Sequence, residues 1–348
     1  MTGSPCTLSD ADPRRLPAFS RTYGEGRLTL GLGFPLVTRG DEDAVSDIGH
    51  QVEIARAAES GGFAALYARD IPLRVPSFGD VGQVYDPWIF LTHVAAHTSR
   101  IALGTAAVVL PVRHPLHVAK SAASLDRLTG GRFLLGVASG DRPEEFRAFG
   151  LEQGARGEAF RENLAVMTHA LTTEMRGIRW SGGWMHSADV VPKPTASSVP
   201  LIMTGSCQQS IGFLAEHGHG WMTYPRDFDA QRRTAARWRE LVRETSDDDE
   251  VFKPFAQSLQ IDLSDDPDEA ASPIDFGFRI GRRRLVEHLG DLRDIGANHV
   301  LLGVGASRRP IREVVEELAE HVVPQFPALD TSPGPASFRE SSPGTAGR

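Results

Sequence analysis

The segment LIMTGSCQQSIGFLAEHG, residues 201–218, carries side chains that could bind a charged ligand. A short apolar run enters a Gly-Ser step and continues into a segment with helical spacing. Backbone N–H groups and the dipole at a helix start favour a phosphate group. Ser206, Cys207 and Ser210 add side-chain donors. The pattern predicts either a phosphate-binding turn or an ordinary helix cap at Ser206.

Two further features of this region could do chemistry. A thiol at a helix start can become a nucleophile when its pKa falls. However, no His with an Asp or Asn partner is identifiable around Cys207, so we favour a binding role for it. His217 and His219 form a His-x-His pair, a spacing that can bind metal. We expect both histidines to be solvated, at the end of the domain opposite the ligand-binding residues, and we predict no metal centre.

Charged residues follow two other predicted strands. Asp70 ends the run ARD, residues 68–70. It is either one half of an ion pair or loop cap, or a catalytic proton acceptor that contacts ligand. Arg113 and His114 follow the apolar run 101–111 and either face substrate or cap the next helix.

The elements that must position these residues alternate along the chain. Apolar runs predict strands at 28–34, 63–67, 101–109, 132–137, 200–203, 219–223, 255–262 and 299–304. Helical spacing predicts helices at 46–60, 87–98, 115–128, 156–173, 207–217, 228–244, 281–295 and 311–322. Alternating strands and helices form a parallel sheet, and eight repeats favour a (β/α)8 TIM barrel with insertions. Its site would then lie among the loops after the strands.

Composition limits the classes of function. The 348 residues carry a formal net charge of −8, which argues against nucleic acid or anionic membrane as a partner. The chain shows neither a membrane-length apolar run nor a signal-peptide h-region, and with two cysteines we expect a cytoplasmic protein. We predict a flexible N-terminal tail over 1–24, a single barrel domain over 25–326 and a disordered C-terminal tail over 327–348.

The strand GTAAVVLP, residues 104–111, has its small residues in the middle. They either let the barrel pack closely or let backbone approach a flat ligand. LGTAAVVLPVRHP, with the following AKSAASLDRLTGGRFLLGVASGD, resembles bacterial luciferases and luciferase-like monooxygenases over strands 3 and 4. The resemblance implies a β-bulge with a non-prolyl cis peptide at Ala106–Ala107, against the ring of a flavin.

The same resemblance assigns further residues. It implies that Ser206, Cys207 and Ser210 bind the flavin phosphate, with Ser139 and Gly140 as a second wall. Phe34 would line the pocket floor and Tyr224 would lie near the ring, although either aromatic side chain could equally serve packing. Luciferase carries an Arg at the position of Ser139. It also carries a histidine where this chain has Arg69 and Asp70.

The function expected from the resemblance is an FMN-dependent monooxygenase, an oxidoreductase that takes reduced FMN from a separate reductase and uses O2 to oxidise a small organic substrate. No G-x-G-x-x-G follows a strand, so no dinucleotide site is visible. The alternatives are a deazaflavin-dependent hydride-transfer dehydrogenase and a non-catalytic flavin-binding protein. We also expect a homodimer through the apolar helix at residues 87–98.

Overall fold

The computed structural model describes residues 8–34, 36, 47–78, 85–246 and 251–329. Within them, eight parallel strands close into a barrel because β10 pairs with both β9 and β13. The strands are β1 (Thr29–Phe34), β2 (Ala65–Ala68), β3 (Ala102–Thr105), β5 (Phe133–Ala138), β8 (Leu201–Thr204), β9 (Gly220–Thr223), β10 (Phe255–Leu263) and β13 (His299–Gly303). The predicted TIM barrel is confirmed.

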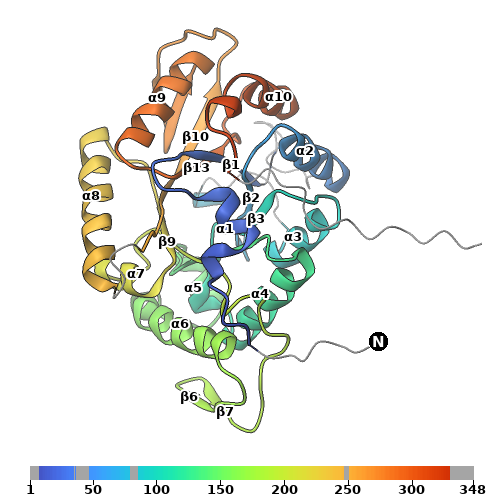
Figure 1. The fold of residues 1–348 in the computed structure, drawn as a ribbon, viewed down its shortest axis with the longest axis vertical. Coiled ribbons are helices and arrows are strands. Elements are labelled where there is room, and N and C mark those ends of the chain that lie inside the picture. Colours follow the sequence, from blue (N-terminus) through green and yellow to red (C-terminus); the bar gives the residue numbers. More distant parts are fainter. Residues whose placement is uncertain (1–7, 35, 37–46, 79–84, 247–250, 330–348) are drawn as a thin grey trace, which may run out of the picture.

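A ring of helices surrounds the barrel (Figure 1). These are α2 (Ile48–Ser60), α3 (Pro87–Ala95), α4 (Pro115–Thr129), α6 (Arg156–Thr172), α7 (Ile211–His217), α8 (Phe228–Thr245), α9 (Arg282–Asp294) and α10 (Ile311–His321). Local signals set their ends: Asp86 caps α3, and Gly130 ends α4 in a left-handed conformation with φ 64°. The helix expected from residue 207 begins later, at Ile211, because residues 205–210 form a turn.

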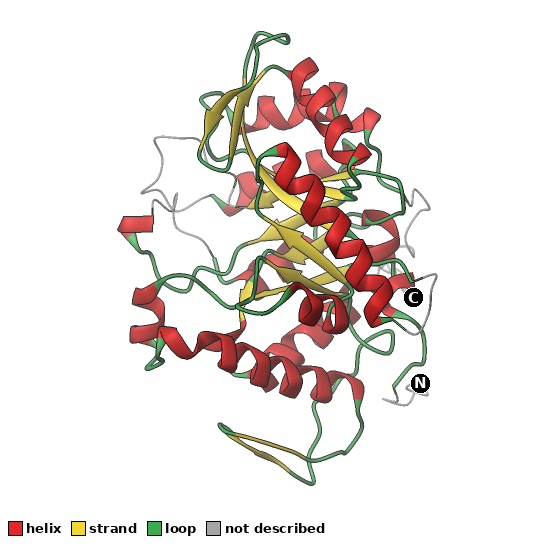
Figure 2. Ribbon diagram, turned by 90° about the vertical axis from the view of Figure 1, so that its left-hand side faces the viewer, coloured by secondary structure: helices red, strands yellow, loops and turns green. Residues whose placement is uncertain are grey.

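Several shorter elements decorate this core. They are β4 (Val108–Val109), which pairs with β5, α5 (Pro143–Ala148), and two hairpins, β6 (Ile178–Trp180) with β7 (Gly183–Met185), and β11 (Ser272–Ile274) with β12 (Gly277–Ile280). Figure 2 shows the β6–β7 hairpin standing apart from the barrel strands. In the described part of the chain, no helix has the length and apolarity to cross a membrane.

The segment before the barrel is not the flexible tail expected for residues 1–24. Its described part contains a 3-10 helix (Pro13–Arg15) and α1 (Pro17–Thr22), which lies at the centre of the ring (Figure 1). Phe19 and Tyr23 are buried against the residues that fill the barrel. The gain from burying these two rings outweighs the polarity of the surrounding sequence. Residues 1–7 and 330–348 lie outside the described residues.

The barrel interior explains one of the small residues in β3. The Tyr67 ring lies inside the barrel, and a Cβ at position 104 would come within 2.5 Å of it. A Cβ at position 31 would lie 2.8 Å from His299 and 2.9 Å from the same tyrosine. The Tyr67 hydroxyl meets that of Tyr23 at 3.4 Å. Gly31 and Gly104 therefore make room for an aromatic core inside the barrel.

We predict that Gly104→Ala destabilises the protein by about 1–3 kcal/mol, because the new methyl group overlaps the Tyr67 ring. Gly33→Ala is the matched control, since a Cβ there would come no closer than 3.5 Å to any atom. Urea unfolding of both variants measures the difference. Equal losses of unfolding free energy in the two variants would contradict the overlap with the Tyr67 ring.

Histidine burial predicts a pH dependence of stability. Burial lowers the pKa of His299 to about 3, and burial with the nearby Lys253 and Arg14 lowers that of His219 to about 4. His219 accepts a hydrogen bond from the Leu201 amide at 2.9 Å, so the solvated pair expected from the sequence is wrong at this position. Both side chains are neutral in the folded state and take up protons near pH 6.5 when unfolded. Their stabilisation is complete above that pH and is lost as the pH falls towards their folded values.

Between pH 7.5 and 5.0 we therefore expect a loss of about 2 kcal/mol for each of these histidines. His299→Gln should reduce the difference in unfolding free energy between the two pH values by about 2 kcal/mol. His321→Gln, at an exposed site on the last turn of α10, should leave it unchanged. Urea unfolding at the two pH values gives the comparison, and an unaltered pH dependence in His299→Gln would refute it.

Candidate functional site

The candidate site lies where the barrel strands end. Parallel strands bring all their following loops to one edge, which is where TIM barrels build their sites. The opposite edge is closed by α1. The loops after β2, β4, β5, β8, β9 and β10 contain, respectively, Asp70, Arg113, Ser139, Ser206, Tyr224 and the insertion 264–281. We call this edge the mouth.

A bulge between β3 and β4 forms part of the mouth. The Ala106–Ala107 peptide bond is cis, as the resemblance implied, and both alanines are partly exposed. The Thr105 hydroxyl donates to the Gly136 carbonyl at 2.8 Å and accepts from the Gly136 amide at 3.0 Å. A Cβ at position 136 would lie 2.0 Å from the Thr105 carbonyl oxygen. The absence of a side chain on β5 therefore lets the bulge press against it.

The turn after β8 has an unusual backbone. Gly205, Cys207 and Gln208 have φ values of 68°, 50° and 56°, and successive left-handed residues can gather N–H groups on one side of a turn. Ser210, and not Ser206, caps α7, accepting from the Phe213 amide at 3.2 Å.

The second wall expected for a phosphate lies beside this turn. Val137 of β5 pairs with Met203 of β8, which places Ser139 and Gly140 next to the start of the turn. Gly140 has φ 78°, and a Cβ there would lie 2.6 Å from Val109. Four of the expected phosphate residues, Ser139, Gly140, Ser206 and Ser210, thus lie in the segments that follow two adjacent strands, β5 and β8.

The Cys207 side chain points into the protein. Its Sγ lies 3.6 Å from the Val137 carbonyl oxygen and 3.3 Å from that of Thr204, beneath the turn. Burial raises the pKa of this thiol to about 12. Cys207 is therefore an uncharged packing group at neutral pH, and only its backbone can contact a ligand.

Asp70 is fully engaged within the protein. Its Oδ2 accepts from the Val109 amide at 3.0 Å and from Arg113 Nε at 2.8 Å, while its Oδ1 accepts from Arg113 Nη2 at 2.6 Å. Arg113 also reaches Asp86, the cap of α3, at 2.9 Å. Burial lowers the pKa of Arg113, but the two carboxylates raise it more, so the guanidinium stays charged. Asp70 thus ties the strand after the bulge to α3, which favours the ion-pair interpretation over a catalytic base.

Of the remaining expected residues, Tyr224 reaches the mouth, whereas His114 and Phe34 have structural roles. His114 caps α4 through Nδ1, which accepts from the Leu116 amide at 3.3 Å. The Phe34 ring is buried against Phe90 of α3, with centroids 4.9 Å apart, because it points away from the barrel interior. It does not reach the mouth. Tyr224 does, with half of its side chain exposed.

Charged side chains from neighbouring loops lie near the Tyr224 hydroxyl. Burial and Asp141 raise the pKa of its hydroxyl, while Arg69 and Arg142 oppose them. The Arg142 guanidinium lies over the Phe78 ring at 5.0 Å. The loops after β2, β5 and β9 therefore meet around one aromatic hydroxyl.

Sequence reasoning missed Glu145, which lies in the first turn of α5. Its carboxylate is fully buried, and neither oxygen has a hydrogen-bond partner among the described residues. Burial raises its pKa to about 6, against the opposing charge of Arg142. In the sequence, PEEF reads as an ordinary acidic first helical turn. Only the loop packed over it makes this glutamate unusual.

Around the mouth and elsewhere in the described residues, no three His, Cys, Asp or Glu side chains form a group that could hold a metal ion.

We predict that Asp70→Asn destabilises the protein by about 3 kcal/mol, because Arg113 loses a buried charged partner. Asp141→Asn, at an exposed position in the same mouth, should change stability by less than about 0.5 kcal/mol. Urea unfolding compares the two. A stable Asp70→Asn variant that has lost activity would instead identify Asp70 as a proton acceptor.

Comparisons with known proteins agree with this geometry. The chain matches the luciferase-like monooxygenase family over residues 25–318. An uncharacterised protein of Mycobacterium tuberculosis is 34% identical over 197 residues, which are 50% of this chain and 67% of that protein. The 4-hydroxyprotoasukamycin monooxygenase of Streptomyces nodosus subsp. asukaensis is 28% identical over 60% of this chain and 58% of its own length.

Solved structures share the fold. A monooxygenase from Streptomyces bottropensis has a TM-score of 0.71 at 20% identity, covering 86% of this chain and 99% of the other. An F420-dependent secondary alcohol dehydrogenase, in complex with an F420–acetone adduct, has the same TM-score and coverage at 17% identity. Because the family match extends over nearly the whole barrel, this chain belongs to the luciferase-like monooxygenase family.

Proposed function

We propose that this protein is a monooxygenase that uses reduced FMN, delivered by a separate reductase, to oxidise a small organic substrate with O2. The observation that carries the proposal is the bulge at Ala106–Ala107 together with the turn 205–210, which follow strands on either side of β5. The first offers a surface without large side chains, and the second offers backbone donors. This pairing suits a flat ring joined to a phosphate.

The residues at the mouth fit such a cofactor. A Cβ at Gly140 would overlap Val109 at 2.6 Å and crowd the Phe146 ring at 3.1 Å, so only glycine lets the backbone after β5 pass this close to them. Ser206 and Ser139 supply hydroxyl donors beside it. Thr105 holds the bulge on β5, and Asp70 holds the strand that follows it. FMN would supply the redox chemistry, whereas the chain binds it, orients it and limits access of water.

A deazaflavin is the second candidate cofactor. The F420-dependent dehydrogenase resembles this fold as closely as the Streptomyces bottropensis monooxygenase does, and such a cofactor would mean hydride transfer without oxygen. The charges that surround Tyr224 include both signs, Asp141 against Arg69 and Arg142. A strongly anionic tail would find no uniformly basic groove there, which favours FMN.

We predict that the protein binds reduced FMN with a low-micromolar Kd under anaerobic conditions and binds reduced F420 more weakly. When a reductase supplies FMNH2 and an oxidisable substrate is present, consumption of O2 should yield oxygenated product. Without the substrate, the O2 consumed should appear as hydrogen peroxide. Tighter binding of F420 would contradict the proposal and point to a dehydrogenase. FMN binding without any turnover would point to a flavin-binding protein.

Gly140→Ala should weaken FMN binding at least tenfold, because the added methyl group overlaps Val109 and displaces the backbone of the proposed second phosphate wall, Ser139 and Gly140. Gly150→Ala is the control: Gly150 also has a positive φ, 70°, but no atom lies within 4 Å of a Cβ there. Fluorescence titration compares FMN with riboflavin, which lacks the phosphate. Equal effects of the two substitutions would place the phosphate elsewhere.

A further inference from the structure

The top of β10 carries an element that the proposed cofactor site does not use. Residues Gln260–Leu263 extend beyond the pairing with β9 and instead pair in parallel with Gly277–Ile280 of β12, which is joined to β11 by a tight hairpin. We call residues 264–281 the β10 insertion.

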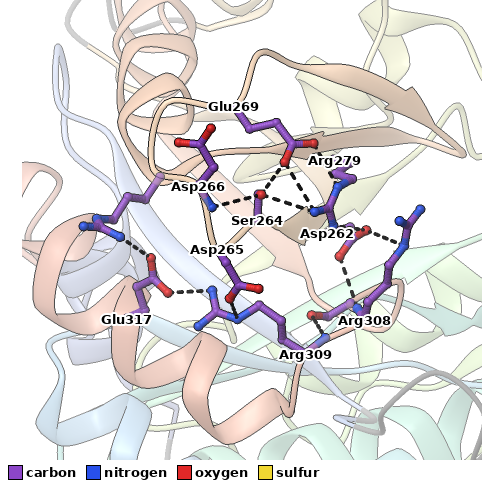
Figure 3. Close-up of polar contacts among 11 residues, drawn as sticks. Asp262, Ser264, Asp265, Asp266, Glu269, Arg279, Arg308, Arg309 and Glu317 are labelled. Carbon is purple, nitrogen blue, oxygen red and sulfur yellow. Dashed lines mark hydrogen bonds and ion pairs between the residues drawn. The ribbon is translucent and has the colours of Figure 1, made fainter.

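A buried carboxylate holds the base of this insertion (Figure 3). Asp262, only 2% exposed, accepts from Arg279 Nη1 at 3.0 Å and lies 3.2 Å from Arg308 Nε through the same oxygen. Its other oxygen accepts from the Arg308 amide at 3.1 Å. Asp262 therefore links β10, β12 and the loop after β13.

A second layer of contacts surrounds that carboxylate (Figure 3). Arg279 Nε donates to Glu269 at 2.9 Å, and its Nη2 donates to the Ser264 hydroxyl at 3.2 Å. Arg309 joins Asp265 at 2.9 Å to Glu317 of α10 at 2.6 Å. Both ends of the β10 insertion are thus fixed to the barrel and to the helical ring. Charged side chains in such a network have little freedom, so the hairpin is held in one orientation.

The tip of the hairpin presents Phe276 to solvent. Its backbone has φ 56°, and its carbonyl accepts from the Gln260 amide at 3.0 Å. Its side chain is 62% exposed, and its ring centroid lies 5.3 Å from that of Tyr224, whose side chain is 51% exposed. A left-handed backbone and an exposed aromatic ring are both unfavourable for phenylalanine in isolation. Two exposed rings in contact at a barrel mouth form a surface suited to an apolar ligand.

We propose that Phe276 and Tyr224 form a binding wall for a planar aromatic part of the organic substrate, and that Asp262 positions this wall through Arg279. This inference rests on the proposed function. Aromatic rings attract further rings in offset or edge-on contact, with centroids 4.5–7 Å apart, in roughly the geometry that this pair already has. Tyr224 lies between Phe276 and the turn, with its ring 4.0 Å from the position of a Gly205 Cβ. The outer ring is therefore placed for substrate rather than for cofactor.

The first test uses benzyl alcohol and cyclohexylmethanol, a neutral pair that differs in ring planarity. Saturation-transfer NMR titrations are run on the full-length protein with and without FMN. Benzyl alcohol should bind at least fivefold more tightly than cyclohexylmethanol. Phe276→Ala should weaken benzyl alcohol binding at least fivefold, and Phe276→Trp should restore it. Trp184→Ala, which removes an equally exposed ring on the distant β6–β7 hairpin, should leave it unchanged.

Two results would overturn the binding wall. One is benzyl alcohol binding that is absent or indifferent to Phe276→Ala. The other is an increase in the FMN Kd in Phe276→Ala with no change for benzyl alcohol, which would make Phe276 a flavin contact. Failure of the proposed function is distinguishable: the wild-type protein would then not bind FMN, while benzyl alcohol binding measured without FMN would still depend on Phe276.

The positioning role of Asp262 is tested by coupling. Asp262→Asn should weaken benzyl alcohol binding about as much as Phe276→Ala does, and the double variant should be no weaker than Phe276→Ala alone. Glu269→Gln, a milder change in the same network, covers the case in which Asp262→Asn does not fold, and it should weaken binding in the same direction. Additive effects in the double variant, or unchanged binding in both single variants, would show that the network does not act through Phe276.

Discussion

The contact between the β3–β4 bulge and β5 organises the mouth of this barrel. It exists because Gly136 has no side chain: a Cβ there would lie 2.0 Å from the Thr105 carbonyl oxygen. The Thr105 hydroxyl then bonds both the amide and the carbonyl of the same glycine. The close approach puts Ala106 and Ala107 at the rim with their backbone accessible. Without it, β4 could not continue beside β5.

Buried charges hold the surrounding loops at fixed distances from this bulge. Asp70 binds the Val109 amide and Arg113, and Arg113 in turn reaches the cap of α3. On the other side, Asp262 joins the β10 insertion to the loop after β13. In both cases a carboxylate at a strand end accepts from an arginine and from the backbone amide of a segment distant in the sequence. Removing one partner leaves an uncompensated buried charge, which makes these pairs strong positioning devices.

Much of the architecture was predictable because it depends on local patterns. Apolar runs and helical spacing located all eight barrel strands and the helices between them, with errors mainly at the ends. The positions of the N-terminal segment and of several site residues were not predictable in this way. Phe19 and Tyr23 lie in a polar stretch, and their burial depends on a cavity formed by distant strands. Phe34 faces the helices and not the barrel interior, where its ring packs against Phe90 of α3. Because strand side chains alternate between the two faces, its neighbour Gly33 is the residue that faces inward.

The site shows the same division. Small residues in GTAAVVLP and the Gly-Ser step in TGSCQQS indicated, from sequence, where backbone would be exposed. The positions of Cys207 beneath the turn and of Asp70 in an ion pair required the tertiary structure, since each depends on a partner from another strand. Glu145 and Phe276 carried no local signal at all.

By itself, the sequence determined the barrel, its order of strands and helices, and the chemistry available at the strand ends, because periodicity and turn residues act over short distances. The tertiary structure alone decided which charges are paired, which histidines are buried and neutral, and which rings face the mouth. Those properties depend on the distance between residues far apart in the chain, and that distance exists only once the barrel has closed.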